Sequence, residues 1–359
     1  MRAALALAAR GLGRVWPNPA VGCVLVRPDG SVLARGWTQA GGRPHAEAEA
    51  LARAGAAARG ATAYVSLEPC AHHGKTPPCA DALVAAGIAR AVVALEDPDP
   101  RVAGQGIAKL RDNGIAVETG LLAAEAADLN QGFLLRVTAN RPLVALKLAT
   151  TLDGRIATAS GESRWITGEP ARARAHLLRA EHDAIMVGEA TALADDPELT
   201  CRIPGLEDRS PVRVVLAGGR GLPATAKLAR TARRQPTWLL CRSGDGARAQ
   251  PLAAEGVQVI EIPGAAAGGI DLAAALAALA GRGITRLLVE GGGRLAAAFL
   301  AADLVDRLYW LRAPGLIGGD GIPAVAALGL DKLAASPRFR RTGLAPLGED
   351  VMETYSRRP

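Results

Sequence analysis

The sequence predicts an α/β fold in two units. Short runs of β-branched and other apolar residues alternate along the chain with longer segments rich in Ala, Leu, Glu and Arg, which is the pattern of strands followed by helices. This alternation breaks near Thr138–Pro142 and then starts again. With 359 residues, of which 49% are hydrophobic, the chain is long enough to bury two cores of ordinary size. We place the two units at residues 1–140 and 141–359.

In the first unit, turn residues and apolar runs indicate four strands and four helices. The turn at Pro28–Gly30 predicts that the first two strands form a hairpin. Gly87 and Gly114 are expected to end two of the helices. The predicted strands are Val21–Val26, Ser31–Ala34, Ala61–Leu67 and Ala91–Leu95, and the predicted helices are Met1–Arg10, Ala46–Arg59, Cys79–Ala86 and Gly106–Asn113.

The second unit repeats the strand-and-helix alternation with a different set of elements. Asp271 and Gly281 are suitable residues to begin and end one of its helices. The predicted strands are Leu143–Leu148, Ala184–Val187, Val212–Leu216, Trp238–Cys241, Val257–Ile262, Leu287–Glu290 and Leu308–Leu311, and the predicted helices are Pro170–Glu181, Asp271–Ala280 and Arg294–Leu304.

Composition argues against several classes of protein. The net charge is +7, but nearly all of the 42 basic residues are Arg and they are spread along the chain without a basic run, so we do not expect a nucleic-acid partner. No apolar stretch of about 20 residues is present, so no membrane span is predicted. The five cysteines have no disulfide spacing, and Cys23, Cys201 and Cys241 are expected to be inert buried thiols. A reducing cytoplasm fits this pattern best.

One His and two Cys predict a catalytic zinc site. His45 lies two residues before Glu47, and Cys70 and Cys79 follow at the end of a predicted strand and at the start of a predicted helix. One imidazole and two thiolates leave the fourth zinc position open for water, as a catalytic site requires. Glu47 is then the proton shuttle, in the arrangement of zinc-dependent nucleobase deaminases. His45 can act with Glu47 only from the N-terminus of the helix, where Pro44 favours a helix start.

The spacing of the two cysteines differs from that of the general signature. Eight residues separate Cys70 from Cys79, where the signature has two. The intervening loop must leave the metal and return, and it carries His72, His73 and Lys75, which suit an anionic group on the substrate. Each of these residues taken alone is more often structural, but the ordered set favours zinc over coincidence.

The second unit carries a glycine turn between a strand and a helix. Residues 291–296 match G-x-G-x-x-A after Leu287–Glu290, a geometry in which backbone amides and a helix N-terminus can hold a phosphate. The turn lies late in its unit and has no acidic residue about 20 residues further on, so the pattern alone leaves open a phosphate ligand or an ordinary tight turn. Lys147 lies in an apolar strand, where a functional lysine and an edge lysine that reaches solvent are both open.

The whole chain resembles the family of bifunctional riboflavin-biosynthesis deaminase/reductases. The eight-residue cysteine spacing is specific to that family, and the matching blocks run in order from about residue 10 to about residue 310. The blocks are Pro17–Val24, Pro44–Glu47, Thr62–Cys79, Leu146–Arg155, Ser160–Thr167, Leu193–Thr200 and Val289–Gly293.

This resemblance implies a fold and two consecutive reactions. The fold would be an N-terminal cytidine-deaminase-like three-layer α/β/α domain and a C-terminal dihydrofolate-reductase-like α/β domain. The reactions would be the second and third steps of riboflavin biosynthesis. The first is zinc-dependent hydrolytic deamination of 2,5-diamino-6-ribosylamino-4(3H)-pyrimidinone 5′-phosphate. The second is NADPH reduction of the ribosylamino sugar to give 5-amino-6-ribitylamino-uracil 5′-phosphate. A homo-oligomer acting on phosphorylated pyrimidines is also implied.

The resemblance also implies roles for individual residues. Zn²⁺ would be held by His45, Cys70 and Cys79, with Glu47 catalytic and with Asn18, His73 and Lys75 on the substrate. Lys147 is the candidate for proton handling in the reduction. NADPH contacts would come from Ala149, Trp165, Thr191, Asp195, Gly292, Gly293, Arg294, Leu295, Ala296, Ala297 and Ala298. Substrate contacts in the reductase would come from Ser163, Arg179, Leu199, Arg202 and Glu290.

One departure from the family pattern concerns the cofactor. After Val214–Leu216 the family often has an acidic residue and then a small polar one, but this chain has Ala217 and Gly218. A monofunctional deaminase with a degenerate reductase unit is therefore one alternative. A nucleic-acid base deaminase is another, although it would leave the second unit unexplained and the sequence offers no aromatic platform. A purely structural zinc site is disfavoured by the open fourth position.

Overall fold

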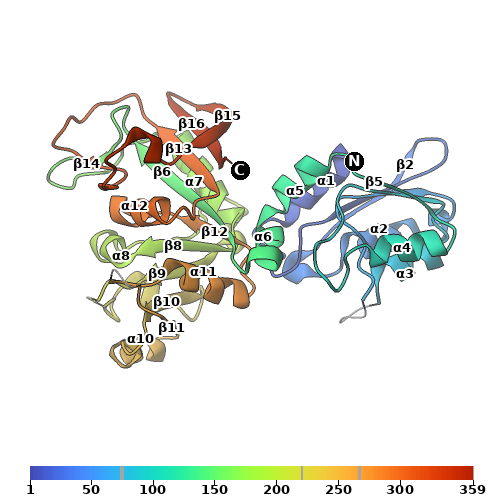
Figure 1. Cartoon of the computed structure of the whole chain (residues 1–359), viewed down its shortest axis with the longest axis horizontal. Helices are drawn as coiled ribbons and strands as arrows, with labels where there is room; N and C mark the ends of the chain where they lie inside the picture. Colours follow the sequence, from blue (N-terminus) through green and yellow to red (C-terminus); the bar gives the residue numbers. More distant parts are fainter. Residues whose placement is uncertain (73–76, 220, 266–267, 359) are drawn as a thin grey trace. The chain divides into compact units, whose positions relative to one another are not determined.

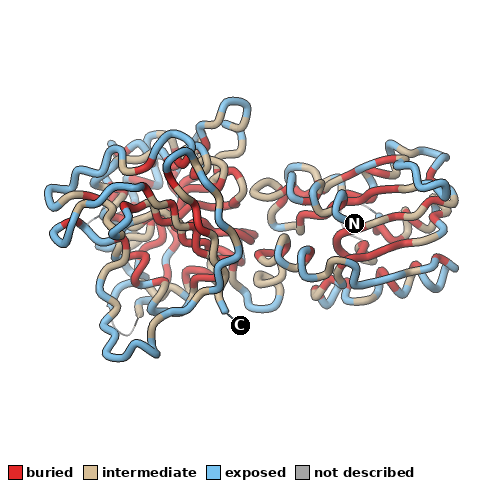
Figure 2. The backbone as a smooth tube through the Cα atoms, turned by 90° about the horizontal axis from the view of Figure 1, so that it is seen from above, coloured by how far each residue is buried: buried red, intermediate tan, exposed pale blue. Residues whose placement is uncertain are grey.

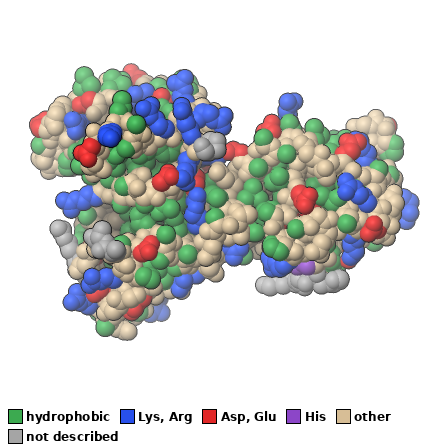
Figure 3. All heavy atoms as spheres, in the orientation of Figure 1, with side chains coloured by type: hydrophobic (Ala, Val, Ile, Leu, Met, Phe, Trp, Pro, Cys, Tyr) green, Lys and Arg blue, Asp and Glu red, His purple; other side chains and the backbone are tan. Residues whose placement is uncertain are grey.

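We analysed a computed structural model of the chain that describes residues 1–72, 77–219, 221–265 and 268–358. The chain divides into two compact units, Met1–Arg141 and Pro142–Pro359, and each is described by itself. His73 and Lys75 lie outside the described residues. Among the described helices, none is long and apolar enough to cross a membrane. On the face that Figure 3 shows, Lys and Arg side chains are interspersed with Asp and Glu.

The first unit is built on a five-stranded sheet with the order β2-β1-β3-β4-β5 (Figure 1). The hairpin of β1 and β2 is antiparallel, as the Pro28–Gly30 turn predicts, and β1 also runs antiparallel to β3. The remaining pairs are parallel. The strands are β1 (Gly22–Val26), β2 (Val32–Trp37), β3 (Thr62–Val65), β4 (Arg90–Val93) and β5 (Ala116–Thr119).

Helices cover both faces of this sheet, which confirms the predicted three-layer α/β/α arrangement. Gly22 and Gly36 allow the helices to approach closely, because a Cβ at Gly22 would lie 1.9 Å from the carbonyl oxygen of Ala4 and one at Gly36 would lie 2.2 Å from that of Ala46. Cys23 pairs with Gly36, so Gly22 and Gly36 face opposite sides of the sheet. The helices are α1 (Arg2–Ala8), α2 (Ala46–Ala54), α3 (Cys79–Ala85), α4 (Gln105–Asp112), α5 (Ala123–Leu129) and α6 (Gln131–Ala139).

Two details of the first unit differ from the sequence expectation. Helix α2 ends at Ala54 instead of Arg59, because Gly55 adopts φ +56° and a short 3₁₀ turn follows it. Strand β5 and helices α5 and α6 were not predicted. Three of the four residues of β5 are exposed, so the strand lacks the apolar run that identifies a buried one.

The second unit contains a nine-stranded sheet with the order β11-β10-β9-β8-β12-β6-β13-β16-β15 (Figure 1). The pairs from β11 to β13 are parallel, so their carboxyl ends meet at one edge of the sheet. The strands are β6 (Leu143–Thr150), β8 (Ala184–Gly188), β9 (Val212–Leu216), β10 (Thr237–Arg242), β11 (Gln258–Ile262), β12 (Arg286–Val289), β13 (Arg307–Arg312), β15 (Phe339–Leu347) and β16 (Asp350–Arg357).

Six α-helices belong to the described part of this unit, and a separate pair of short strands lies beside the large sheet. Asp271 caps α11 as predicted, because its side chain accepts a hydrogen bond from the Ala274 amide at 3.0 Å. The helices are α7 (Glu169–Ala180), α8 (Glu189–Asp195), α9 (Lys227–Arg230), α10 (Gln250–Ala254), α11 (Leu272–Gly281) and α12 (Gly293–Ala301), and the short strands are β7 (Arg155–Ala157) and β14 (Ile322–Pro323).

Each unit has its own apolar core, in which buried residues follow the central strands (Figure 2). Lys147 belongs to β6, which pairs with β12 on one side and β13 on the other. The interpretation of Lys147 as an edge lysine is therefore wrong. The sequence analysis did not predict the hairpin of β15 and β16. Strand β15 lies at the edge of the sheet, all its residues are exposed or half-buried, and it contains Gly343 and Pro346, so it lacks the apolar run that indicates a strand.

Candidate active sites

The three predicted zinc donors converge in the first unit from two helix starts and one strand end. His45 is the residue before α2 and has extended backbone angles, and Cys79 is the first residue of α3. Pro44 and Pro78, which directly precede them, favour helix starts there. Cys70 follows β3. The backbone amides at both helix starts carry partial positive charge, which favours negative charge on sulfur.

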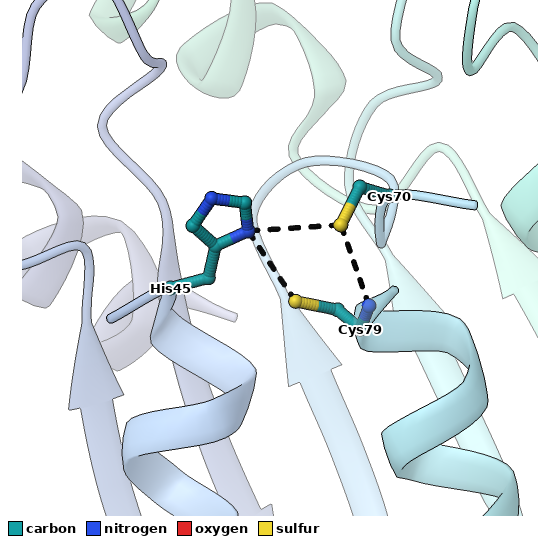
Figure 4. Close-up of side chains that lie close together, drawn as sticks. All are labelled: His45, Cys70 and Cys79. Carbon is teal, nitrogen blue, oxygen red and sulfur yellow. Dashed lines mark hydrogen bonds between the residues drawn. The ribbon is translucent and has the colours of Figure 1, made fainter. Parts of the chain in front are cut away.

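The donor atoms lie within bonding reach of one ion (Figure 4). The Nδ1 atom of His45 lies 3.6 Å from Sγ of Cys70 and 3.4 Å from Sγ of Cys79, and all three ligand atoms lie within 4.8 Å of one another. The Cys79 amide also donates a hydrogen bond to Sγ of Cys70 at 3.3 Å. One nitrogen and two sulfurs at these separations fit a tetrahedral zinc ion with an open fourth position.

The interaction of the two cysteine side chains shifts their pKa values in opposite directions. The Cys79 thiol donates to Cys70, which lowers the pKa of Cys70, and the same interaction raises the pKa of Cys79. A hydrogen bond with Cys70 also raises the pKa of His45. Because a thiol must lose its proton to bind a metal, binding of zinc would release protons from these cysteines.

Glu47 lies in the first turn of α2, and it is only 3% exposed. Burial and the nearby charge of Cys70 raise its pKa to about 7, and its carboxyl group also interacts with the Cys79 thiol. A carboxyl group with a pKa near neutrality beside an open metal position can both accept and return a proton.

Asn18 contacts the side of His45 that faces away from the sulfurs. Its amide nitrogen lies 3.4 Å from Nε2 of His45 and donates a hydrogen bond to the carbonyl oxygen of Gly42 at 2.8 Å. Asn18 also lines a cavity of about 290 Å³ together with His45, Glu47 and Cys70. The structure therefore brings Asn18 to the metal donors, where it can both orient His45 and contact a ligand.

The cavity has residues that sequence reasoning did not single out. They include one aromatic and several charged side chains, which are Arg43, Asp97, Asp99, Arg101, Phe133 and Arg136, and they lie beside His72, which the sequence analysis did name. Burial is the largest influence on Asp97 and raises its pKa to about 6. These residues come from three separate segments, which are the residues before α2, the loop before α4, and α6, and no local spacing in the sequence connects these segments with one another.

In the second unit, the structure brings together Lys147, Arg179 and Glu290, all three of which were predicted site residues. Arg179 donates from Nε to Oε1 of Glu290 at 2.8 Å and from Nη2 to Oε2 at 3.0 Å. Nζ of Lys147 lies 3.5 Å from Oε2 of Glu290. Burial alone would raise the pKa of Glu290, but Arg179 and Lys147 outweigh it and lower the pKa to about 2. The result is a buried, ionised carboxylate held by two cations.

The glycine turn before α12 has the close packing expected of a nucleotide cradle. A Cβ at Gly291 would lie 3.2 Å from Cα of Val187, and one at Gly293 would lie 2.7 Å from the carbonyl oxygen of Pro323. Gly292 lies against the predicted cofactor residue Thr191, since a Cβ there would be 3.1 Å from the Thr191 hydroxyl. Backbone amides at a helix start beside a hydroxyl fit a pyrophosphate. Leu295, Ala296 and Ala297 are buried, and their apolar side chains carry no group that could donate a hydrogen bond to a phosphate.

The remaining predicted reductase residues do not all lie in contact with one another. Trp165 is 68% exposed and its ring is covered by the Arg172 guanidinium at 4.8 Å. Leu199 is buried, and Arg202 pairs with Glu198 at 3.7 Å. The other five are exposed or half-buried, and they are Ala149, Ser163, Asp195, Arg294 and Ala298.

A second cavity, of about 320 Å³, lies at the carboxyl ends of β9 and β10 and includes Ala217 and Gly218. An acidic group does border this position, but it comes from Glu189 at the start of α8. A Cβ at Gly218 would lie 3.1 Å from Oε2 of Glu189, whose Oε1 accepts a hydrogen bond from the Gly221 amide at 2.7 Å. The departure at residues 217 and 218 thus coincides with a carboxylate supplied by α8, the helix that follows the neighbouring strand β8.

Comparison with known families gives a match in each unit. The family described as "Cytidine and deoxycytidylate deaminase zinc-binding region" matches residues 1–95, and the family described as "RibD C-terminal domain" matches residues 142–352. Two relatives are named "Riboflavin biosynthesis protein RibD". The one from Escherichia coli K12 is 44% identical, covering 98% of this chain and 96% of its own, and the one from Aquifex aeolicus is 40% identical, covering 99% and 97%.

Solved structures extend the similarity over both units. Acinetobacter baumannii RibD, form 1, has a TM-score of 0.89 at 39% identity, covering 100% of this chain and 98% of that chain. A Thermotoga maritima protein described as a "diaminohydroxyphosphoribosylaminopyrimidine deaminase/ 5-amino-6-(5-phosphoribosylamino)uracil reductase" has a TM-score of 0.87 at 34% identity, covering 99% and 97%. These matches confirm the predicted deaminase-like and reductase-like folds.

Proposed function

The chain belongs to the RibD family of riboflavin-biosynthesis proteins, and on that basis we propose which of its residues perform each reaction. It is a bifunctional enzyme with a zinc-dependent deaminase and an NADPH-dependent reductase, as the sequence analysis predicted. We assign the deaminase to the unit Met1–Arg141 and the reductase to the unit Pro142–Pro359. A degenerate reductase unit and a nucleic-acid deaminase are both set aside, because bifunctional relatives match the chain over nearly its whole length.

We propose that the substrates are those in the description of the Thermotoga maritima relative. The deaminase would hydrolyse the 2-amino group of the diaminopyrimidinone ribosylamino 5′-phosphate, and the reductase would convert the resulting ribosylamino sugar to the ribityl chain. The observation that carries this proposal is the convergence of His45, Cys70 and Cys79 on one point beside the buried Glu47. The family resemblance further suggests a homo-oligomer, and the five unpaired cysteines support a reducing compartment such as the cytoplasm.

In the deaminase, His45, Cys70 and Cys79 would hold the zinc ion. When bound, zinc lowers the pKa of a coordinated water to about 7 and so makes a nucleophile available at neutral pH. Glu47 would accept the proton that this water loses as its oxygen bonds to the ring carbon. Glu47 would then pass the proton to the amino group, so that ammonia leaves and a ring carbonyl remains. Asn18 would keep the His45 ring in its orientation.

Other residues that line the deaminase cavity would bind the pyrimidine ring and the 5′-phosphate of the substrate. Phe133 offers an apolar surface to the pyrimidine ring, and Arg43, Arg101 and Arg136 line the same cavity. Arginine matches the geometry of a phosphate through its planar group of donors, so these side chains suit the 5′-phosphate. We retain His73 and Lys75 as proposed phosphate contacts from the resemblance alone.

In the reductase, bound NADPH would supply the hydride for the sugar carbon. The glycine turn before α12 and Thr191 would hold its pyrophosphate. Lys147 would give a proton to the sugar oxygen that is released as the ring opens, and Glu290 would hold the Lys147 side chain in place. Arg179 would fix Glu290 from the other side. The remaining cofactor and substrate residues stay proposals from the resemblance.

A coupled assay tests the proposed substrates. The zinc-loaded protein is given the diaminopyrimidinone ribosylamino phosphate and NADPH, while ammonia and the absorbance of NADPH are followed together. We expect ammonia release first and NADPH oxidation that depends on it. Ammonia release without NADPH oxidation would reject the assigned reductase substrate. If neither signal changes, the proposed deaminase substrate is wrong.

A further inference from the structure

The carboxylate of Glu68 has no role in the reactions described above, although it lines the deaminase cavity. Glu68 lies after β3 and two residues before the metal donor Cys70, and it is only 4% exposed. We propose that Glu68 is a positioning residue of the deaminase, which holds one wall of the substrate cavity, residues 97–104, in a fixed place beside the metal donors. This inference rests on the proposed deaminase function of the unit.

One oxygen of Glu68 closes the loop of residues 97–104 at both of its ends. Oε2 accepts a hydrogen bond from the amide of Asp97 at 3.1 Å and another from the amide of Gly104 at 3.0 Å. The second oxygen, Oε1, accepts a hydrogen bond at 3.0 Å from the amide of Ile107, in the first turn of α4. A single buried side chain therefore satisfies backbone amides from the two ends of the loop and from the helix that follows it.

Backbone contacts place the same segments against the chain that carries Cys70. The Glu68 amide donates to the carbonyl oxygen of Leu95 at 2.9 Å, just before the loop begins. Beyond the other end of the loop, a Cβ on Gly106 would lie 1.9 Å from the carbonyl oxygen of Pro69, so α4 can pack this closely only with glycine at this position. The loop is thus attached beside Cys70 at both ends, and a shift of Glu68 would move it relative to the metal donors.

The loop has a defined shape of its own. The Asp99 amide donates to Oδ1 of Asp97 at 2.9 Å, and the Arg101 amide donates to Oδ1 of Asp99 at 3.0 Å. The Val102 amide donates to the carbonyl oxygen of Asp99 at 2.7 Å. Because these contacts are local, they fix the shape of the loop but not its place in the unit. The carboxylate of Glu68 contributes that place.

The loop presents polar side chains to the cavity. Asp97, Asp99 and Arg101 line it together with Glu47 and Cys70. Carboxylates accept hydrogen bonds and a guanidinium donates them, so this wall can hold a polar ring and its substituents beside the metal donors. The position of the wall therefore determines how well a substrate fits the cavity.

The test compares Glu68→Gln with Gly106→Ala in the full zinc-loaded chain. In Glu68→Gln, one oxygen becomes an NH₂ group, which cannot accept a hydrogen bond from a backbone amide. In Gly106→Ala, the added methyl group pushes the start of α4 away from Pro69 without any change of charge. Glu118→Gln is the matched control, because it removes the same charge from an exposed residue of β5.

Hydrogen–deuterium exchange measures the attachment of the loop without any substrate. A hydrogen bond to a charged group is typically worth enough to predict a roughly 10- to 100-fold faster exchange of the peptide that covers residues 97–107 in Glu68→Gln. We expect the same peptide to exchange faster in Gly106→Ala and to remain unchanged in Glu118→Gln. The other peptides of the unit should exchange as in wild type.

Steady-state assays connect the loop to the reaction. Both variants should raise the KM for the diaminopyrimidinone ribosylamino phosphate by roughly 10-fold, while kcat for ammonia release stays within about threefold, because the binding wall moves and the proton shuttle does not. Zinc should remain at about one ion per chain. NADPH oxidation with separately supplied deaminated substrate should not change, since that activity belongs to the other unit.

Three results would overturn this inference. They are an unchanged KM in both variants, a lower unfolding temperature without any change in KM, and a loss of zinc from Glu68→Gln, which would make Glu68 a support of the metal site. If the wild-type protein releases no ammonia from the proposed substrate, that substrate is rejected and the exchange data decide the role of Glu68. Faster exchange confined to residues 97–107 then supports the inference, and equal exchange overturns it.

Discussion

Arg179 and Glu290 face each other through two hydrogen bonds, from Nε to Oε1 at 2.8 Å and from Nη2 to Oε2 at 3.0 Å. Both side chains are largely buried, and Nζ of Lys147 approaches the same carboxylate at 3.5 Å. A buried carboxylate is tolerated because two cations surround it. The same carboxylate therefore contributes to the stability of the reductase unit and holds Lys147, the proposed proton donor, in place.

The first prediction concerns the pH dependence of stability. The pKa of Glu290 lies at about 2 in the folded protein and near 4.5 otherwise, so its contribution is complete above pH 4.5 and is lost as the pH falls toward 2. In that window the contribution should fall by roughly 1.4 kcal/mol per pH unit. Denaturant unfolding at pH 5, 4 and 3 should show a steeper loss in wild type than in Glu290→Gln. Equal slopes would show that the pKa of Glu290 is not depressed.

The second prediction separates the two activities. Lys147→Met should lower the rate of NADPH oxidation by roughly 10²- to 10⁴-fold, the usual contribution of a positioned acid. The rate of ammonia release should stay within about twofold, because Lys147 belongs to the other unit. Stopped assays of both products on the same preparation measure this. Equal losses of both activities would indicate a folding defect, and retention of both would remove Lys147 from the mechanism.

Local patterns were sufficient to predict much of the fold and the metal donors. The start of α2 at Ala46 was expected from Pro44, and it is this start that lets His45 reach the sulfurs of Cys70 and Cys79. The open fourth position followed from the donor types alone. Strand β9 was also predicted with the observed bounds, although Arg213 interrupts its apolar run.

Local sequence patterns could not predict contacts that depend on the order of the strands in the sheet. Arg179 and Glu290 are 111 residues apart in the chain, and they meet because β12 lies between β8 and β6. The approach of Glu189 to Gly218 follows from the pairing of β8 with β9, so the doubt raised by residues 217 and 218 could not be addressed without it. Sequence periodicity identifies strands but does not specify their neighbours.

The third prediction concerns removal of one metal ligand. Cys79→Ser should reduce zinc from about one ion per chain to near zero after dialysis, because a hydroxyl is a poor replacement for a thiolate. Ammonia release should disappear, and NADPH oxidation with the separately supplied deaminated substrate should remain. Metal analysis by mass spectrometry gives the zinc content. Cys23→Ser is a matched control, since Cys23 is fully buried in the same unit and is not one of the donors. Full zinc occupancy in Cys79→Ser would exclude Cys79 as a ligand.

The last prediction distinguishes catalysis by Glu47 from a structural role. Glu47→Gln keeps the shape of the side chain, and Glu47 is not one of the three metal donors, so zinc content should stay at about one ion per chain. Ammonia release should fall by roughly 10²- to 10⁴-fold, because an amide cannot accept a proton from water and return it to the amine. Glu49→Gln is the matched control on the same helix, where Glu49 pairs with Arg53, and it should keep full activity. If Glu47→Gln loses zinc as well as activity, the carboxylate supports the metal site. If it keeps both, a different group carries the proton, and the buried Asp97 becomes the next residue to replace.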